Sequence, residues 1–308
     1  MKYPNFFILG APRCGTTSLC DYLRTNPRVF VSRPKEIHFF AEDFSTSRME
    51  QRLAKTEDEY VDFFKEATPF HIAAGEGAVL YLSSKVAVEK IRKFNPESKI
   101  IVLIRNHVDF VASWHACLVY NCVEPITDLK DAWNAIEKRR TEQPLPPLRN
   151  NPKFLLYSDI AKFGEQLERV YSIFPRNQIK VILNEDFSAA PECIYREVLE
   201  FLNVPADART EFPRINRNKI NRYPRLATFF SALPPAVVWA MRMIKTLTGL
   251  KRFGIAPWVR RHNRIFVKRK PLDPLFRKEL IDFFREDRNK LSRLLNRDLT
   301  HWKNETTT

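Results

Sequence analysis

Residues 6–19 read FFILGAPRCGTTSL, and this stretch decides the fold of the chain. Its first four residues are apolar, which is typical of a fully buried parallel strand. Gly10 and Gly15 then bracket a tight turn, and a helix with an apolar face is expected to begin at Thr16. The order of strand, glycine-bracketed loop and helix predicts a loop that wraps an anionic phosphate with backbone N–H groups and the positive end of the helix.

The residues that close this loop indicate which phosphate it holds. A loop for a nucleoside triphosphate ends with Lys followed by Ser or Thr, where the Lys reaches the β- and γ-phosphates. Here the loop continues with Thr16 and Thr17, and the cation stands earlier, at Arg13. The sequence therefore predicts a phosphate-binding loop, but not one for a triphosphate with Mg²⁺.

The same alternation of strand and helix continues along the chain. Buried strands are predicted at residues 99–104 and 180–183, and a helix follows each of them within a few residues. This alternation predicts an α/β fold of the P-loop type, with three layers in which helices flank a central parallel sheet. Ligands of such sheets bind at the carboxyl ends of the strands, where Arg13 and Arg105 both stand.

The segments between these units are less regular. An apolar run at residues 29–31 is followed by Pro34, which predicts an edge strand or the entry to a loop. Ser83 is the expected cap of one helix. The expected helices cover residues 57–64, 84–94, 128–140, 158–174 and 192–202, with an amphipathic helical stretch at 237–250 and a final helix at 274–295.

Composition limits the class of protein. With 308 residues, 44% hydrophobic content and 7 Gly, the chain is an ordinary globular protein; we expect one domain over residues 1–308, with a core at 1–208 and a basic, mainly helical extension at 209–308. The 5 Cys are odd in number and lack C-x-x-C spacing, which favours reduced thiols and no metal site. Neither a signal peptide nor a membrane span is predicted, so a cytoplasmic protein is expected.

The net charge of +15 is unevenly distributed. Residues 1–208 carry 27 Lys+Arg against 28 Asp+Glu, whereas residues 209–308 carry 24 against 8. Such a basic segment can face nucleic acid, an anionic membrane, a polyanionic substrate or the phosphates of a cofactor, or it can be a solvated surface. Within it, the amphipathic residues 233–253 could lie on a membrane as a peripheral contact, cover an acceptor cleft or pack on their own domain.

Three motifs occur in one order: GAPRCGTTSL at residues 10–19, PKEIHFF at residues 34–40, and the pair Arg105 and Ser113. Together they resemble the nucleotide-dependent sulfotransferases, specifically the carbohydrate type that includes heparan sulfate sulfotransferases and many bacterial members. The resemblance covers most of residues 5–205. It implies that 3′-phosphoadenosine 5′-phosphosulfate (PAPS) donates a sulfuryl group, without a metal, to a hydroxyl or amine of a glycan, lipid or small alcohol, leaving 3′-phosphoadenosine 5′-phosphate (PAP). A nucleic acid partner is not expected.

The resemblance also implies which residues hold the donor. The first loop would bind the 5′-phosphosulfate through Arg13, Cys14, Gly15, Thr16, Thr17 and Ser18. Arg13 stands where relatives commonly carry Lys; its guanidinium can stabilise charge on the bridging oxygen but cannot donate a proton.

The 3′-phosphate is assigned to a second set of residues. Arg105 and Ser113 would grip it, and the planar fork of Arg105 can take two phosphate oxygens at once. A basic loop before the final helix would close over the same phosphate. Its members are Lys268, Arg269 and Lys270.

Glu36 matches the catalytic base of the heparan sulfate enzymes, where a carboxylate takes the proton of the acceptor. His38 is a rival base because its ordinary pKa lies closer to neutral. If residues 35–39 are extended, both side chains project to one face. Glu76 matches a segment in which heparan-type relatives read Glu-Lys, but here Gly77 replaces the Lys. Glu76 is expected to be either a second active-site carboxylate or a partner of Arg13 or Lys35.

Two other functions remain open. A P-loop kinase would need a Lys at the end of the loop and a Mg²⁺-binding carboxylate after a strand, and Thr16 and Arg105 stand at those places. A non-enzymatic basic protein would bind a membrane or a polyanion through residues 209–270.

Overall fold

The computed structural model describes residues 3–44, 51–141, 152–213, 218–231, 262–267 and 269–303. The expected helical stretch at 237–250, the candidate membrane contact at 233–253 and Lys268 lie outside the described residues.

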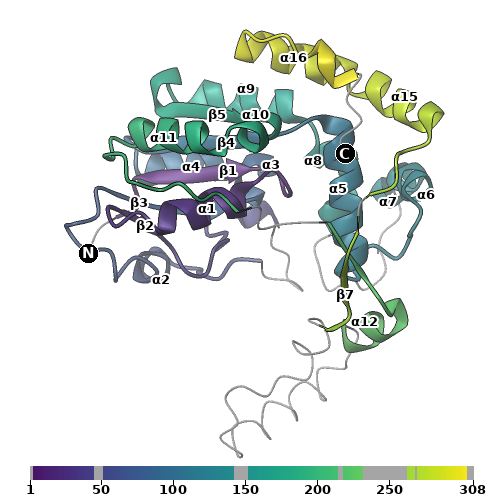
Figure 1. Ribbon diagram of the computed structural model, residues 1–308, viewed down its shortest axis with the longest axis horizontal. Helices are drawn as coiled ribbons and strands as arrows, with labels where there is room; N and C mark the ends of the chain where they lie inside the picture. Colours follow the sequence, from purple (N-terminus) through teal and green to yellow (C-terminus); the bar gives the residue numbers. More distant parts are fainter. Residues whose placement is uncertain are drawn as a thin grey trace, which may run out of the picture.

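A parallel sheet lies at the centre of the described chain (Figure 1). Its five strands are, in spatial order, β2 (Val29–Val31), β3 (Ala73–Ala78), β1 (Phe6–Gly10), β4 (Lys99–Ile104) and β5 (Ile179–Leu183). Every neighbouring pair is parallel. The predicted α/β fold is therefore confirmed, and the short run before Pro34 is an edge strand as expected.

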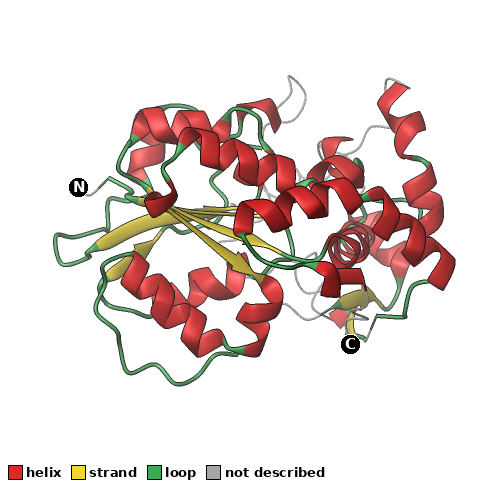
Figure 2. Cartoon of the chain, turned by 90° about the horizontal axis from the view of Figure 1, so that it is seen from above, coloured by secondary structure: helices red, strands yellow, loops and turns green. Residues whose placement is uncertain are grey.

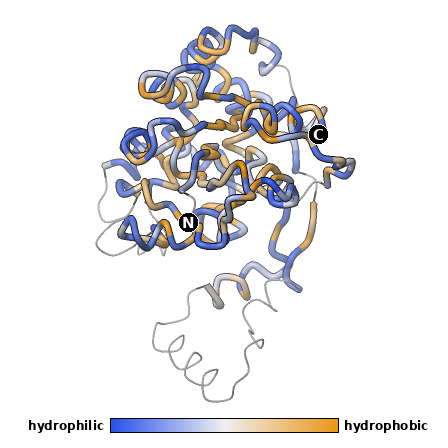
Figure 3. The backbone as a smooth tube through the Cα atoms, turned by 90° about the vertical axis from the view of Figure 1, so that its left-hand side faces the viewer, coloured by the Kyte–Doolittle hydropathy of each residue, from blue (hydrophilic) through white to orange (hydrophobic). Residues whose placement is uncertain are grey.

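Burial explains why these segments pair. All five residues of β1 are buried, and so are five of the six residues of β4, because helices cover both faces of a parallel sheet (Figure 2). Hydrophobic residues accordingly concentrate in the central strands (Figure 3).

Strand β3 was not predicted, because its sequence AAGEGA has no large apolar residue. It pairs with β1 through Phe6 and Gly75, and a Cβ on Gly75 would lie 2.3 Å from the Phe6 carbonyl oxygen. Small residues are therefore what allow this strand to lie between β1 and β2. Its position places Glu76 and Gly77 beside the central strand β1.

The helices mostly follow the expected positions. Their bounds are α1 Thr16–Arg24, α2 Glu57–Asp62, α3 Leu80–Ser83, α4 Ala87–Phe94, α5 His107–Tyr120, α6 Leu129–Asn134, α7 Ile136–Thr141, α8 Tyr157–Ile160, α9 Phe163–Ile173, α10 Asn184–Ala189, α11 Pro191–Phe201, α12 Pro224–Ser231, α15 Pro274–Phe283 and α16 Arg285–Leu295. Three long predicted helices are each divided in two, at residues 135, 161–162 and 284.

The expected cap at Ser83 is wrong. The hydroxyl of Ser84 instead accepts hydrogen bonds from the N–H groups of Val86 and Ala87, at 3.2 and 3.0 Å, so α4 begins three residues later than predicted.

The C-terminal region contacts the helices around the sheet in two places. Helix α16 packs on α9, where the Asp287 carboxylate accepts hydrogen bonds from the N–H groups of Gly164 and Glu165 at 2.8 and 3.0 Å. The antiparallel pair β6 (Lys219–Asn221) and β7 (Arg264–Phe266) is tied to α5 through Asn221, and with α12 it extends away from the sheet in Figure 1. That residues 1–308 form one domain stays a prediction.

Across the described ranges, no helix combines the length and the apolar character that crossing a bilayer requires.

Candidate active site

The loop between β1 and α1 depends on two glycines. A Cβ on Gly10 would lie 2.5 Å from the Cγ2 atom of Thr16, so the chain can turn here only without a side chain. Gly15 has φ 97°, in the left-handed region that glycine enters without steric cost. Arg13 shares that region at φ 67°, which is strained for a residue with a side chain. Such strain is common where a loop must present groups to a ligand.

The start of α1 leaves donors at this loop. The first hydrogen bond of the helix runs from the Leu19 N–H to the Gly15 carbonyl oxygen at 3.0 Å, so the N–H groups of Thr16, Thr17 and Ser18 precede the helical ladder. Cys14 differs, because its N–H donates to the carbonyl oxygen of Ala11.

The Cys14 thiol also faces inward. It donates to the Pro12 carbonyl oxygen at 3.7 Å, and burial raises its pKa to about 12. Of the loop residues predicted to hold the donor, Cys14 therefore supports the loop from within, since both of its donors are already used.

The two predicted residues that follow β4, Arg105 and Ser113, lie together with the loop. Arg13 donates from Nε to the Ser113 hydroxyl at 3.4 Å, and Arg105 donates from Nη1 to the Arg13 carbonyl oxygen at 3.3 Å. The Nη2 atom of Arg105 lies 3.8 Å from a carboxylate oxygen of Asp109. The spacing of Arg105 and Ser113 in the sequence thus corresponds to a shared position at the carboxyl ends of β1 and β4.

Arg269 joins this group from far along the chain. Burial, followed by the positive charges of Arg105 and Arg13, lowers the pKa of its guanidinium to about 10 although the charge of Asp109 acts the other way. The Nε atoms of Arg105 and Arg269 are buried and find no hydrogen-bond acceptor among the described residues. Buried donors rarely lack an acceptor, so this cluster fits an anion with several oxygens, such as a phosphate. Lys270, beside it, is exposed.

The segment PKEIHFF lies across the loop from these arginines. The Lys35 ammonium donates to the Thr16 hydroxyl at 3.1 Å and lies 2.7 Å from a carboxylate oxygen of Glu36. The condition of an extended segment is not met, since Glu36 and His38 have φ 68° and 59°. They are nevertheless close, with 3.8 Å between the His38 Nε2 atom and a Glu36 oxygen.

The two candidate bases differ in exposure. The Glu36 side chain is 38% exposed, whereas the His38 side chain is 10% exposed and its Nδ1 atom is buried with no hydrogen-bond partner in the described chain. Burial lowers the pKa of His38 to about 4, against the opposing effect of the Glu36 charge. His38 is therefore neutral at physiological pH and weakly basic, while Glu36 can be reached by an acceptor.

Glu76 has neither of its expected roles. Its carboxylate is completely buried and does not contact Arg13 or Lys35. One oxygen accepts from the N–H groups of Ile37 and His38 at 2.9 and 3.2 Å. The other accepts from the hydroxyls of Tyr60 and Tyr81 at 3.0 and 2.9 Å. Burial outweighs these hydrogen bonds and raises its pKa to about 7. Glu76 thus supports the backbone on which Glu36 stands.

Two cations at the site were not assigned from the sequence. The sequence suggests Lys35 only as a neighbour of Glu36 and as a candidate partner of Glu76, although its place in PKEIHFF could have indicated a role. Lys219 lies close enough to Arg13 that the arginine charge, after burial, helps to lower its pKa. No sequence signal distinguishes Lys219 from the many other cations of the C-terminal region.

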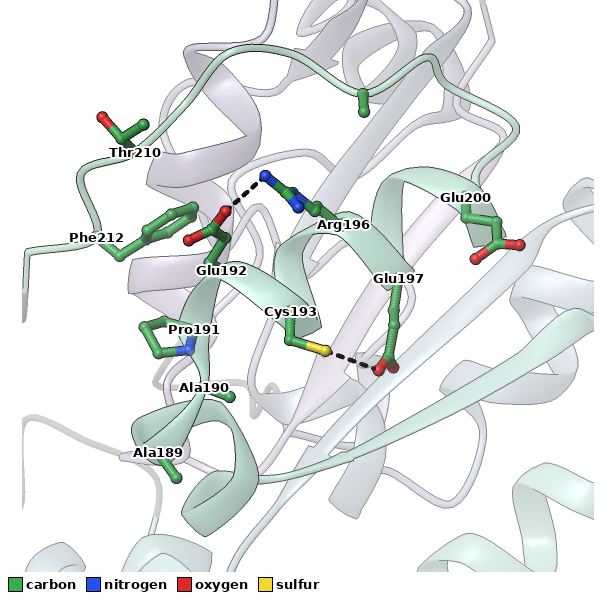
Figure 4. A pocket seen from close by; sticks show the side chains of 11 residues that line it. Ala189, Ala190, Pro191, Glu192, Cys193, Arg196, Glu197, Glu200, Thr210 and Phe212 are labelled. Carbon is green, nitrogen blue, oxygen red and sulfur yellow. Dashed lines mark hydrogen bonds and ion pairs between the residues drawn. The ribbon is translucent and has the colours of Figure 1, made fainter.

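A groove of about 860 Å³ lies beside α11, away from these residues (Figure 4). Its charged side chains contact each other: Arg196 lies 2.6 Å from Glu192, and the Cys193 thiol lies 3.5 Å from Glu197. None of the predicted site residues lines it. The described ranges also contain no group of three or more His, Cys, Asp or Glu side chains that could hold a metal ion.

Comparisons with known proteins agree with this geometry. A family model described as a sulfotransferase domain matches residues 3–229. Among curated proteins, the chain is similar to the bifunctional heparan sulfate N-deacetylase/N-sulfotransferase 3 of Mus musculus, with 25% identity over 206 residues that cover 66% of this chain and 22% of that protein. It is also similar to the membrane-associated sulfotransferase kil1 of Dictyostelium discoideum, with 21% identity over 271 residues that cover 65% and 56%.

The chain thus spans about a fifth of the length of the heparan sulfate relatives that it matches. Among solved structures, a sulfotransferase from Alicyclobacillus acidocaldarius is similar over 98% of this chain and 100% of that one, with a TM-score of 0.70 and 25% identity.

Proposed function

Because the chain belongs to the sulfotransferase family, we propose that it transfers a sulfuryl group from PAPS to a hydroxyl or amine of an acceptor. The observation that carries this proposal is the cluster of Arg13, Arg105 and Arg269, in which two buried Nε atoms lack acceptors. A donor with phosphates at both 5′ and 3′ positions requires two anion sites. The loop after β1, and Arg105 after β4 together with Arg269, would supply these two sites side by side.

Each anion site has its own donors. Arg13, Gly15 and the three N–H groups at residues 16–18 would hold the 5′-phosphosulfate. Arg105, Ser113 and Arg269 would hold the 3′-phosphate, with the exposed Lys270 at the rim. When bound, the donor supplies a sulfuryl group attached to a phosphate, and these residues orient it and offset its charge.

Glu36 would take the proton of the acceptor as the new bond to sulfur forms. Its exposure and its place beside the phosphate loop support this role. His38 is the weaker candidate, because its side chain is only 10% exposed against 38% for Glu36, so an acceptor reaches it less readily. A histidine that is buried in this way fits a role in shaping the segment around Glu36.

A carbohydrate is the acceptor class that we propose. Its support is the similarity to enzymes whose names specify heparan sulfate, which extends over about two thirds of this chain. Incubating the protein with radiolabelled PAPS and a panel of glycans, lipids and small alcohols tests this choice. Label found only on lipids or small alcohols would overturn the carbohydrate assignment and leave sulfuryl transfer intact.

Calorimetric titration with PAP tests the activity itself. We expect PAP to bind, and adenosine 3′-phosphate and adenosine 5′-phosphate to bind more weakly, since each would fill one anion site. Titration with ATP and Mg²⁺ is the control for the kinase alternative, which is not favoured. Magnesium-dependent ATP hydrolysis without PAP binding would contradict the proposal.

We also propose that the basic C-terminal region contacts an anionic membrane surface. From Phe212 to Leu272 the sequence has 15 Lys+Arg and no Asp or Glu. In the described part of this region, Ile220 and Ile265 are paired across β6 and β7 and are 45% and 38% exposed. Because Asn221, the residue after Ile220, bonds to α5, the two isoleucines lie on the opposite face of the strand pair. Apolar side chains among cations fit a lipid surface better than a glycan or nucleic acid.

Sedimentation with vesicles tests the membrane contact. We expect the protein to sediment with vesicles of phosphatidylcholine and phosphatidylglycerol, less so in high salt, and not with phosphatidylcholine alone. The double variant Ile220→Asp/Ile265→Asp should lose binding. Leu275→Asp on α15, which changes a more exposed apolar residue (77%) outside residues 212–272, is the control. If the double variant bound the vesicles as well as the wild-type protein does, the proposal would be contradicted. A cytoplasmic location of the protein stays a prediction.

A further inference from the structure

We propose that Lys35 supplies the ammonium that stabilises the departing 5′-phosphate, and that Gly77 is required because it makes room for the Lys35 side chain. The inference rests on the proposed sulfuryl transfer and adds a catalytic residue to it. Neither the loop motif nor the resemblance assigned a function to Lys35.

The position of Lys35 supports its proposed role at the departing phosphate. Its ammonium lies between the phosphate loop and the expected base, 3.1 Å from the Thr16 hydroxyl and 2.7 Å from Glu36. Thr16 begins α1, where N–H donors are free for an anion. The Lys35 side chain is only 12% exposed, so its charge acts in a region from which water is largely excluded.

The surroundings of Gly77 support the proposed requirement for glycine at this position. A Cβ on Gly77 would lie 2.4 Å from the Cys20 sulfur and 3.3 Å from the Lys35 Cε atom. Any side chain at residue 77 would therefore collide with Cys20 and would press on the stem of Lys35, which would have to shift by a few tenths of an ångström.

The step balances without a proton from Lys35. The acceptor oxygen forms a bond to sulfur while the bond between sulfur and the bridging oxygen breaks, and the electron pair stays on that oxygen as part of the phosphate. The acceptor proton passes to Glu36. Since Glu36 then loses its negative charge, the charge of Lys35 is no longer offset and acts fully on the departing phosphate. Arg13 assists from the other side as a fixed charge.

The variant Lys35→Met tests the role, because it keeps the apolar stem beside Gly77 and Cys20 and removes only the charge. We expect turnover to fall by about 100- to 1000-fold, as for loss of one preorganised donor to developing negative charge. Lys180→Met is the matched control, since Lys180 on β5 pairs with Glu197 on α11 at 2.9 Å and stands outside the site.

Binding gives a readout apart from turnover. PAP carries the fully charged 5′-phosphate, so Lys35→Met should weaken PAP binding by about 10- to 100-fold, the range of a lost charge-assisted hydrogen bond. Adenosine 3′-phosphate lacks that phosphate, and its affinity should not change. In Lys35→Ala, methylammonium should restore turnover in proportion to its concentration, which a purely structural lysine would not allow.

The outcomes separate this inference from the activity on which it rests. Wild-type protein that fails to bind PAP would overturn both. Wild-type protein that binds PAP and transfers sulfate, together with a Lys35→Met variant within twofold of it in both measurements, would overturn the role of Lys35 alone. Gly77→Ala tests the second part: loss of PAP affinity with unchanged adenosine 3′-phosphate affinity is expected, and unchanged affinity for both would overturn it.

Discussion

The arginines around Ser113 and the charged residues of segment 35–38 lie on two sides of the same loop, but their charges are balanced differently. On the first side, the Nε atoms of Arg105 and Arg269 have no acceptor in the described chain, and the nearest carboxylate oxygen to Arg105 is 3.8 Å away. On the second side, Lys35 already lies 2.7 Å from Glu36.

This difference separates affinity from turnover. Uncompensated arginines gain most when an anion arrives, since buried donors then acquire acceptors. The paired Lys35 and Glu36 are nearly neutral as a unit, so they contribute less to the initial attraction and more once a proton has moved. We therefore expect changes on the arginine side to alter mainly the binding of the 3′-phosphate, and changes on the other side to alter the rate of transfer as well as the binding of the 5′-phosphate.

Glu36→Gln should give the largest effect. The amide cannot take the acceptor proton, so turnover should fall by about 100- to 10,000-fold, the usual contribution of a general base. Binding of PAP should hold or tighten, because Lys35 is released from its carboxylate partner. Calorimetry and single-turnover transfer of labelled sulfate measure the two quantities on one preparation. Full activity in this variant would remove Glu36 from the mechanism and erase the contrast between the two sides.

The second-largest effect is expected at Glu76, which supports the same segment and should affect the stability of the protein. Burial raises its pKa from an ordinary 4.5 to about 7. The folded state therefore favours the protonated carboxyl: this contribution is fully present below about pH 4.5 and is lost as the pH rises through about 7. A shift of this size corresponds to about 3 kcal/mol of unfolding free energy.

Glu76→Gln should remove that dependence. Gln can accept at one oxygen and stays neutral, so the stability of the variant relative to wild type should improve from pH 5 to pH 8. Urea unfolding at each pH gives the difference in unfolding free energy between the variant and the wild type. The titration of His38 contributes equally to both proteins and cancels in this difference. Glu200→Gln, on an exposed position, is the control. A difference that does not change with pH would mean that Glu76 ionises normally.

Arg105→Ala should reduce affinity by about 10- to 100-fold, because it removes a charge-assisted contact to the 3′-phosphate. The effect should appear for PAP and adenosine 3′-phosphate and be small for adenosine 5′-phosphate, the opposite of the pattern expected for Lys35. Titrating each variant with all three nucleotides compares the two sides directly. If Arg105→Ala and Lys35→Met change the affinity for every nucleotide by the same factor, the two sides do not bind separate phosphates.

The parts of the fold that could be predicted are those with strong local signals. Strand β4 reads KIIVLI and was placed at its observed limits, because a run of large apolar residues has few alternatives to a buried strand. Strand β3 reads AAGEGA and was missed, because its stability comes from close approach to β1 and not from its own side chains.

The site shows the same limit. The proximity of Arg105, Ser113 and the first loop could be expected, since parallel strands end at one edge of the sheet. The environment of Glu76 could not, because its partners Tyr60 and Tyr81 come from separate segments. The proximity of Glu36 and His38 was expected from an extended backbone and arises instead from two left-handed residues.

Ser113→Ala should have the smallest effect. Its hydroxyl accepts only a long hydrogen bond of 3.4 Å from Arg13, and it would give one neutral donor to the 3′-phosphate. Removing such a contact costs about 0.5–1.5 kcal/mol, or roughly two- to tenfold in PAP affinity, with turnover at saturating donor nearly unchanged. A fall in turnover larger than the loss of affinity would show that Ser113 acts through Arg13 on the departing phosphate. In that case the arginine side would contribute to the rate of transfer as well as to binding. Arg13 would then belong with the residues that affect the rate, and Arg105 with those that affect binding alone.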